Sequence, residues 1–172
     1  MDALRVVPAG DALRIAGQSM AGALVVPAYG PQGLQSLQLI PPPGAGKKLN
    51  LPGAPMAGAS FTVGDVVPGG IGQAWACWVA TGRPAAVCFG WGNVARVAAD
   101  LRQRDASARL VLVPDAGKDT DAAKIARELG CCVAYMPHDE PNNFDANDLA
   151  QRDGADVLAE LLEGATEPPK PA

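Results

Sequence analysis

The chain has 172 residues, enough for one domain or for one domain with an added N-terminal β element. Hydrophobic residues make up 48% of it and aromatic residues only 5%, so the core is built mainly from Ala, Val, Leu and Ile. The net charge of −4 argues against a surface that coats nucleic acid broadly. This charge remains compatible with a domain that acts at a nucleic-acid end while a neighbouring domain binds the rest of the nucleic acid.

Membrane, secretory and zinc-binding functions have no support in the sequence. No apolar run approaches the roughly 20 residues that a membrane span needs, and no N-terminal signal peptide is visible. The cysteines form no C-x-x-C pair, and the single histidine, His138, has no partner at a zinc-ligand spacing. We therefore expect a cytoplasmic protein that does not contact membranes and whose thiols are reduced and structural.

The N-terminal part consists of short β-like runs separated by turns. Residues 24–27, 34–40 and 59–63 are predicted strands, and residues 34–40 partly alternate apolar with polar side chains, as a half-buried antiparallel strand does. The segment Tyr-Gly-Pro-Gln-Gly at residues 29–33 predicts a hairpin connection between the first two runs.

From residue 71 onward, predicted helices alternate with short strands. Apolar residues at helical spacing predict helices over residues 73–80, 94–101, 122–129 and 157–162. Continuous apolar runs predict strands buried on both faces over residues 85–89, 110–113 and 132–136. This alternation predicts an α/β fold whose mainly parallel, Rossmann-like sheet has helices on its faces.

In such a sheet ligands bind beyond the carboxyl ends of the strands. The most conspicuous acids lie at one of these ends: Asp115 directly follows the strand at residues 110–113, Gly117 permits a tight turn, and Asp119 and Asp121 open the next helix. Carboxylates there suit Mg²⁺, which prefers oxygen ligands. Asp119 or Thr120 could equally cap this helix, with Asp121 favouring its positive end. Asp115 precedes the cap position and is the stronger functional candidate.

Two further strand ends carry polar groups. Residues 137–148 follow the strand at 132–136, and Asp145 or Asn147 could either bind a ligand or start the next helix. The glycines of Gly90–Asn93 could approach a phosphate closely, although a helix start capped by Asn93 explains this run equally well. The Gly44–Lys48 loop is not a phosphate-binding loop, because Lys48 stands where Ser or Thr is needed and no helix follows.

Several of these motifs resemble those of Toprim domains in plasmid conjugative and mobile-element DNA primases. Residues 70–76 and 80–85 resemble the segment after the first Toprim strand, and Gly92–Asn93 resembles the turn after the next strand. Residues 113–119 (Val-Pro-Asp-Ala-Gly-Lys-Asp) resemble the Asp-x-Asp strand end, and residues 143–149 the closing Asp-x-Asn-Asp-Leu motif. The last two motifs are fairly specific together and weak separately.

The resemblance covers most of residues 22–163 and implies a fold and a domain organisation. The fold would be a Toprim-like, mainly parallel four-stranded sheet flanked by helices, with an N-terminal antiparallel β element. Residues 1–65 would be a β-rich segment packing on the core, residues 66–165 the Toprim-like domain, and residues 166–172 a linker-like tail.

The resemblance also implies an activity. A DNA primase would synthesise RNA primers on single-stranded DNA by metal-dependent nucleotidyl transfer, in plasmid transfer or DNA replication. Its cofactor would be Mg²⁺ or Mn²⁺. Its partners would be a single-stranded DNA template, ribonucleoside triphosphates, and either other domains of a larger primase polypeptide or a replicative helicase.

The same resemblance assigns roles to individual residues. The catalytic carboxylates would be Asp115 and Asp119. The metal ligands would be four aspartates: Asp115, Asp119, Asp145 and Asp148. The residues that bind nucleotide or nucleic acid would be Gly92, Asn93, Arg96 and Lys118.

Two departures from the family pattern leave the enzymatic status open. Toprim domains carry a Glu at the end of their first strand, where this chain has Pro68-Gly69-Gly70. Gly117 replaces the second Asp of the Asp-x-Asp pair, unless Asp119 takes that role. The alternatives are a catalytically degenerate Toprim-like module that binds nucleic acid or a partner protein, and a nucleotide-binding α/β domain without a polynucleotide substrate.

Overall fold

The computed structural model describes residues 4–64 and 72–168, and its contacts divide the chain into two compact units. Among the described residues, the first unit comprises 4–62 and 86–97, and the second comprises 63–64, 72–85 and 98–168. Each unit has a hydrophobic core of its own.

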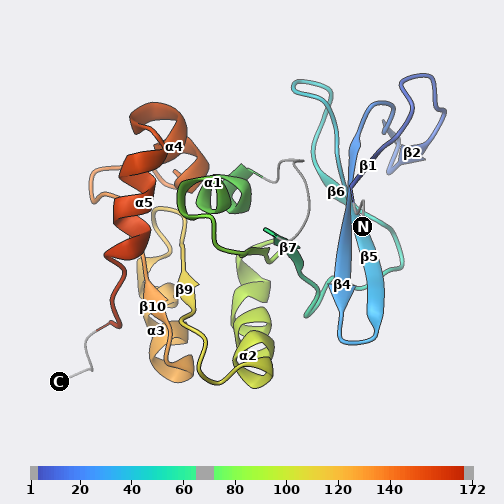
Figure 1. Ribbon diagram of the computed structural model, residues 1–172. Helices are drawn as coiled ribbons and strands as arrows, with labels where there is room; N and C mark the ends of the chain where they lie inside the picture. The colour runs from blue at the N-terminus through green and yellow to red at the C-terminus, as the bar shows by residue number, and fades with distance from the viewer. Residues whose placement is uncertain (1–3, 65–71, 169–172) are drawn as a thin grey trace. The chain divides into compact units, whose positions relative to one another are not determined.

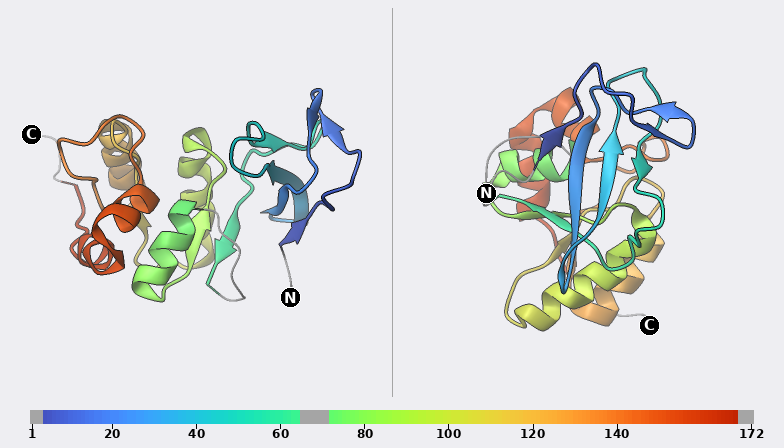
Figure 2. Two further views of the ribbon diagram at one scale, coloured as in Figure 1. Left: turned by 90° about the horizontal axis from the view of Figure 1, so that it is seen from above. Right: turned by 90° about the vertical axis from the view of Figure 1, so that its right-hand side faces the viewer.

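The first unit is built on antiparallel strands. They are β1 (Arg5–Val6), β2 (Arg14–Ile15), β3 (Gln18–Ser19), β4 (Leu24–Gly30), β5 (Gly33–Ile40) and β6 (Leu49–Asn50). A four-stranded antiparallel sheet has the order β1-β4-β5-β6, and β2 pairs with β3 separately. Strands β4 and β5 are the longest pair, and they lie side by side in the right-hand view of Figure 2.

The β4–β5 hairpin confirms the connection predicted at residues 29–33. Gly30 pairs with Gly33, so that Pro31 and Gln32 alone form the turn. Along β5 burial does not follow the apolar–polar alternation, because polar Ser36 and Gln38 are buried whereas Leu34 is exposed. Both are satisfied: Ser36 donates to a main-chain carbonyl, and Gln38 Nε2 donates to the side-chain oxygen of Asn50 at 3.0 Å.

The second unit contains most of the helices (Figure 1). They are α1 (Gly72–Thr81), α3 (Asp119–Leu129), α4 (Ala146–Asp153) and α5 (Ala155–Glu163), while α2 (Val94–Arg104) crosses the boundary between the units. Strands β9 (Val111–Leu112) and β10 (Cys132–Val133) pair in parallel. A short two-stranded sheet joins β7 (Phe61–Val63) to β8 (Ala85–Val87), and the 3₁₀ turn η1 (Trp91–Asn93) precedes α2.

The core of the second unit consists of small and aliphatic side chains from α1, α4, α5 and the ends of the strands. Helix α1 packs against both α4 and α5, and the three lie together in Figure 1. Leu149 of α4 and Leu158 of α5 are almost completely buried, as are Ala134 and Ala146. Helix α3 ends at Gly130, whose φ of 63° is the left-handed conformation that glycine adopts readily at a helix end.

The predicted helices are confirmed and the fold is mixed α/β, but the mainly parallel four-stranded sheet is not found in the described residues. The four-stranded sheet is antiparallel and lies in the first unit, whereas the parallel pairing observed is the two-stranded β9–β10. The physical reason is strand length: β8, β9 and β10 have only two or three residues each. In addition, β8 is half-buried rather than buried on both faces, and its partner is β7.

Other predictions have mixed outcomes. All four cysteines are free, as expected for structural thiols. Within the described ranges, no helix is both long enough and apolar enough to cross a bilayer. The predicted domain boundary at residue 65 stays a prediction, and the contacts group residues 86–97 with the first unit. Residues 68–70, where the resemblance places the end of the first Toprim strand, lie outside the described residues.

Candidate functional site

The loops that follow β9 and β10 meet, as expected for neighbouring parallel strands. The amide of Ala116 donates to the carbonyl of Phe144 at 2.9 Å, and the amide of Asn143 donates to the carbonyl of Ala116 at 3.0 Å. Asp115 is half-buried beside this pair of loops. The two polar clusters that the sequence indicated therefore lie side by side.

A third element reaches the same place. Gln73, in the first turn of α1, donates from Nε2 to the carbonyl of Val113 at 2.9 Å and to Asp115 Oδ1 at 3.3 Å. Sequence reasoning missed Gln73, because a neutral amide near a helix start carries no periodicity or charge signal that distinguishes it from a solvated side chain. Its partner lies 42 positions away in the chain.

Asp145 and Asp148 form a capping box at the start of α4. One carboxylate oxygen of Asp145 accepts hydrogen bonds from the amides of Asn147 at 2.8 Å and Asp148 at 3.0 Å. Asp148 Oδ2 accepts one from the amide of Asp145 at 3.1 Å. The helix-start interpretation of Asp145 is thus realised, and their role as metal ligands stays a prediction.

Asp145 also acts on Cys77 of α1. Burial, and secondarily the negative charge of Asp145, raise the pKa of the Cys77 thiol to about 12. The thiol is therefore protonated near neutral pH and is no nucleophile there.

Asp119 and Lys118 lie at the start of α3. Asp119 is exposed in the first turn, where its charge favours the positive end of the helix dipole. Lys118 is the N-cap residue, and its side chain makes no capping hydrogen bond. Lys118 lies three residues beyond Asp115, at the end of the loop that follows β9, and Asp119 begins α3 one residue later.

The donor set limits what kind of metal site this loop offers. Across residues 4–64 and 72–168, no group of three or more His, Cys, Asp or Glu side chains is arranged to hold a metal ion. Mg²⁺ is commonly held by only one or two carboxylates together with substrate phosphates and waters. Asp115 fits such a site as its protein ligand.

Gly117 stands where the resemblance to Toprim domains expects a second acid, and its backbone conformation favours glycine. Its φ is +89°, and a Cβ at this position would lie 2.7 Å from the side-chain oxygen of Asn142. An aspartate at 117 would therefore be strained and would have to displace Asn142. The position of the missing Glu, at residues 68–70, lies outside the described residues.

Asn93 was predicted to bind nucleotide, but its side chain forms hydrogen bonds to the main chain of the first unit. Its Nδ2 donates to the carbonyls of Met56 at 3.2 Å, Ala59 at 2.8 Å and Cys88 at 3.0 Å. Its Oδ1 accepts from the amide of Gly58 at 2.7 Å. Both polar atoms of the amide are therefore committed to main chain, and Asn93 does not act as a side-chain cap of the following helix.

Gly92 and Arg96, the two neighbours of Asn93 that were also predicted to bind nucleotide or nucleic acid, are exposed. Gly92 is exposed, and a side chain there would meet no atom within 4 Å. Arg96 is exposed on α2 and crosses over Gly58, where a Cβ would lie 2.7 Å from Arg96 Nε.

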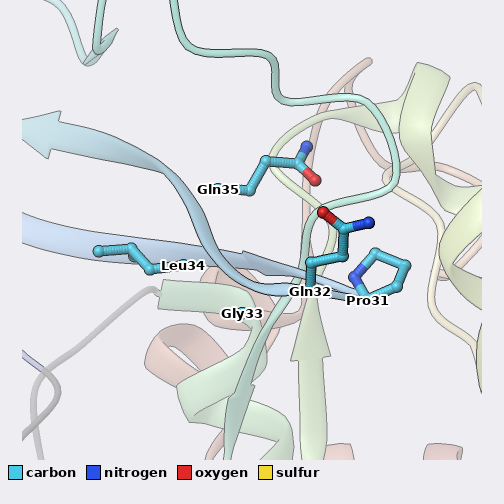
Figure 3. A pocket seen from close by; sticks show the side chains of 5 residues that line it. All are labelled: Pro31, Gln32, Gly33, Leu34 and Gln35. Atoms are coloured by element: carbon cyan, nitrogen blue, oxygen red, sulfur yellow. The ribbon is translucent and has the colours of Figure 1, made fainter.

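A shallow pocket at the β4–β5 turn holds none of the predicted site residues. It is lined by Pro31, Gln32, Gly33, Leu34 and Gln35 (Figure 3). None of these side chains is ionisable, and the Gln35 amide already donates to two main-chain carbonyls. This pocket therefore offers no chemistry.

Arg152 clamps the loop before α4. Its guanidinium hydrogen-bonds to Glu140 at 2.9 Å and to Asp153, and it lies over the Phe144 ring at 4.9 Å from the centroid. The hydrogen bond to Asp153 first, and then the one to Glu140, raise the pKa of Arg152. The carbonyl of Phe144, in turn, accepts a hydrogen bond from the amide of Ala116.

Comparison with known proteins gives one informative likeness. No protein-family profile and no curated protein sequence matches the chain. The crystal structure of the RNA polymerase domain of Mycobacterium tuberculosis primase DnaG is similar, with a TM-score of 0.59 and 21% sequence identity. The similarity covers 85% of this chain and 56% of that one. At this identity it shows the fold alone: the chain has a primase-like fold.

Proposed function

We propose that this chain is the catalytic Toprim module of a DNA primase, which synthesises RNA primers on single-stranded DNA by metal-dependent nucleotidyl transfer. The observation that carries the proposal is the position of Asp115. It follows a parallel strand, beside the loop of residues 142–144 and the start of α1, in a primase-like fold. Plasmid transfer, and partners such as further primase domains or a helicase, belong to the proposal through the resemblance of the motifs.

The distribution of charge supports a division of labour between the two units. Within its described residues, the first unit carries five Lys or Arg against one Asp, a net charge of +4. The described residues of the second carry eight Lys or Arg against fifteen Asp or Glu, a net charge of −7. The basic residues of the first unit are Arg5, Arg14, Lys47, Lys48 and Arg96. We therefore assign template binding to the first unit and cation binding to the second.

Within the second unit, Asp115 would hold Mg²⁺ or Mn²⁺, and Lys118 would bind the triphosphate. A divalent cation bound there supplies positive charge against the charge that develops on the triphosphate. Asp115 has a defined orientation because Gln73 donates to it. The match spans 56% of the primase domain, so residues beyond this chain are part of the proposed complete enzyme.

Primer synthesis on a single-stranded template tests this proposal. The assay contains the full-length polypeptide with its further primase residues, ribonucleoside triphosphates, and Mg²⁺ or Mn²⁺. It compares wild type with Asp115→Asn and with Asp156→Asn, a matched change on an exposed residue of α5. We expect synthesis from wild type and Asp156→Asn and none from Asp115→Asn. Equal synthesis by Asp115→Asn would contradict the assignment.

A degenerate module that only binds nucleic acid is the second candidate. The observation in its favour is Gly117, whose φ of +89° would strain an aspartate and whose Cβ would lie 2.7 Å from the Asn142 side chain. A wild-type chain that binds single-stranded DNA at low salt but makes no primer with either cation would establish this alternative. Loss of that binding on Lys47→Ala plus Lys48→Ala would place it on the first unit.

A further inference from the structure

The contact between Gln73 and Asp115 joins two segments that are far apart in the sequence. Gln73 Nε2 donates to the carbonyl of Val113 at 2.9 Å and to Asp115 Oδ1 at 3.3 Å. Helix α1 itself is anchored on α4 and α5, and Ala74, Ala76 and Cys77 on it are buried. The side-chain amide of Gln73 therefore reaches the end of β9 from a helix packed in the core, not from a loop.

The two acceptors determine which end of the Gln73 side-chain amide faces them. Both the Val113 carbonyl and the Asp115 carboxylate accept hydrogen bonds, so the NH₂ end of the Gln73 side chain must face them. A methionine in this position would fill similar space without a donor. A glutamate in this position would bring a third hydrogen-bond acceptor against the Val113 carbonyl and the Asp115 carboxylate.

We infer that Gln73 is the positioning residue of the Asp115 cation site: its amide fixes the orientation of the carboxylate before a cation arrives. This inference rests on the proposed function only in that the ion is bound at Asp115. Hydrogen bonds from neighbouring side chains orient metal ligands, and their removal commonly weakens metal affinity 10- to 100-fold. In this chain Gly117 contributes no second carboxylate, and Gln73 holds Asp115 from outside its own loop.

The test is the affinity of the full chain for Mn²⁺ alone, measured from the free-ion electron paramagnetic resonance signal. We expect Gln73→Met to weaken binding about 10- to 100-fold. Gln103→Met, on an exposed residue of α2, is the matched control and should leave the affinity unchanged. Gln73→Asn keeps the amide but withdraws it by one methylene, so it should weaken binding as well and serves if Gln73→Met does not fold.

Gln73→Glu separates a positioning role from a merely structural one. Without cation, the added carboxylate repels Asp115 and lowers the midpoint of thermal unfolding. With Mn²⁺, the same carboxylate adds a ligand, so the affinity should equal or exceed that of wild type. A structural role alone predicts that all three Gln73 variants weaken binding in proportion to their loss of stability, and that result would overturn the inference.

The outcomes for the inference and for the proposed function differ. If wild type binds Mn²⁺, Asp115→Asn does not, and Gln73→Met binds like wild type, the inference is wrong and the cation site stands. If wild type binds no Mn²⁺, or Asp115→Asn binds it equally well, the cation site at Asp115 is wrong and the inference falls with it. A shift of the Gln73 side-chain amide resonances on adding a diamagnetic cation, Mg²⁺, would support both.

Discussion

The ends of β9 and β10 carry similar acids but use them in different ways. After β10, Asp145 and Asp148 bind each other's amides and start the helix to which they belong. After β9, the carboxylate of Asp115 is met by Gln73, which comes from another helix. The first arrangement is local and explains a helix boundary, whereas the second is long-range and has no part in starting a helix.

This difference separates structural acids from functional candidates better than charge density does. A carboxylate whose hydrogen bonds lie within one turn of its own helix is accounted for by capping. Asp115 precedes the N-cap position of α3 by three residues, so capping of α3 does not account for it. The comparison therefore concentrates the proposed chemistry on the end of β9.

The largest expected effect is at Asp115. Asp115→Asn should lower primer synthesis by more than about 100-fold, the size typical of removing a group that stabilises charge in the transition state. The thermal unfolding midpoint should stay close to that of wild type, because the amide keeps the shape of the side chain. Activity and unfolding measured on one preparation check both statements. A large loss of stability would instead make Asp115 a structural acid like Asp145.

Asn93 extends the comparison to the loop after β8. Asn93→Ala removes hydrogen bonds to Gly58, Met56, Ala59 and Cys88, and we expect a loss of about 3 kcal/mol in the free energy of unfolding. Urea unfolding checks this value. Asn93→Asp is a useful partner, because it keeps the acceptor for Gly58 but loses the donors. A stable Asn93→Ala protein with weakened nucleotide binding would reverse this assignment.

Local signals in the sequence predicted much of the fold but not the contacts that define the site. Gly130 and the apolar spacing of α3 mark that helix, and residues 29–33 mark the hairpin, because both features depend on neighbours a few positions away. Strand pairing depends on distant segments, so the runs around β8 and β9 did not reveal that β8 pairs with β7.

The same limit applies to the candidate site. Asp115 was found from its place after a strand, and the meeting of its loop with residues 142–144 followed from the parallel arrangement. The contact of Gln73 with Asp115 and the hydrogen bond of Asn93 with Gly58 were not foreseeable, because each joins segments more than 30 residues apart. Side-chain amides carry no charge pattern that would mark such partners.

Cys77 tests the electrostatic surroundings of Asp145. A thiol in the unfolded chain ionises near pH 9.0, whereas burial, and then Asp145, raise the pKa of folded Cys77 to about 12. Its stabilising effect is therefore complete below pH 9.0 and is lost as the pH rises towards 12. In that range Cys77→Ala should flatten the decline in unfolding free energy by up to about 1.4 kcal/mol per pH unit. Chemical unfolding at several alkaline pH values measures the slope, to which Cys88 also contributes.

The smallest expected change in stability is at Asp145, where two substitutions distinguish helix capping by this side chain from a role of its negative charge. Asp145→Ala should lower the free energy of unfolding by about 1 kcal/mol, whereas Asp145→Asn should change it by only a few tenths, because Asn caps helices as well as Asp does. If capping is the whole role of Asp145, Asp145→Asn also binds Mn²⁺ as wild type does. If Asp145→Asn instead weakens Mn²⁺ binding as much as Asp115→Asn, the carboxylate of Asp145 is a ligand in addition to a cap. The ends of β9 and β10 would then form one cation site, since the main-chain hydrogen bonds between Ala116 and Phe144 already hold their loops together.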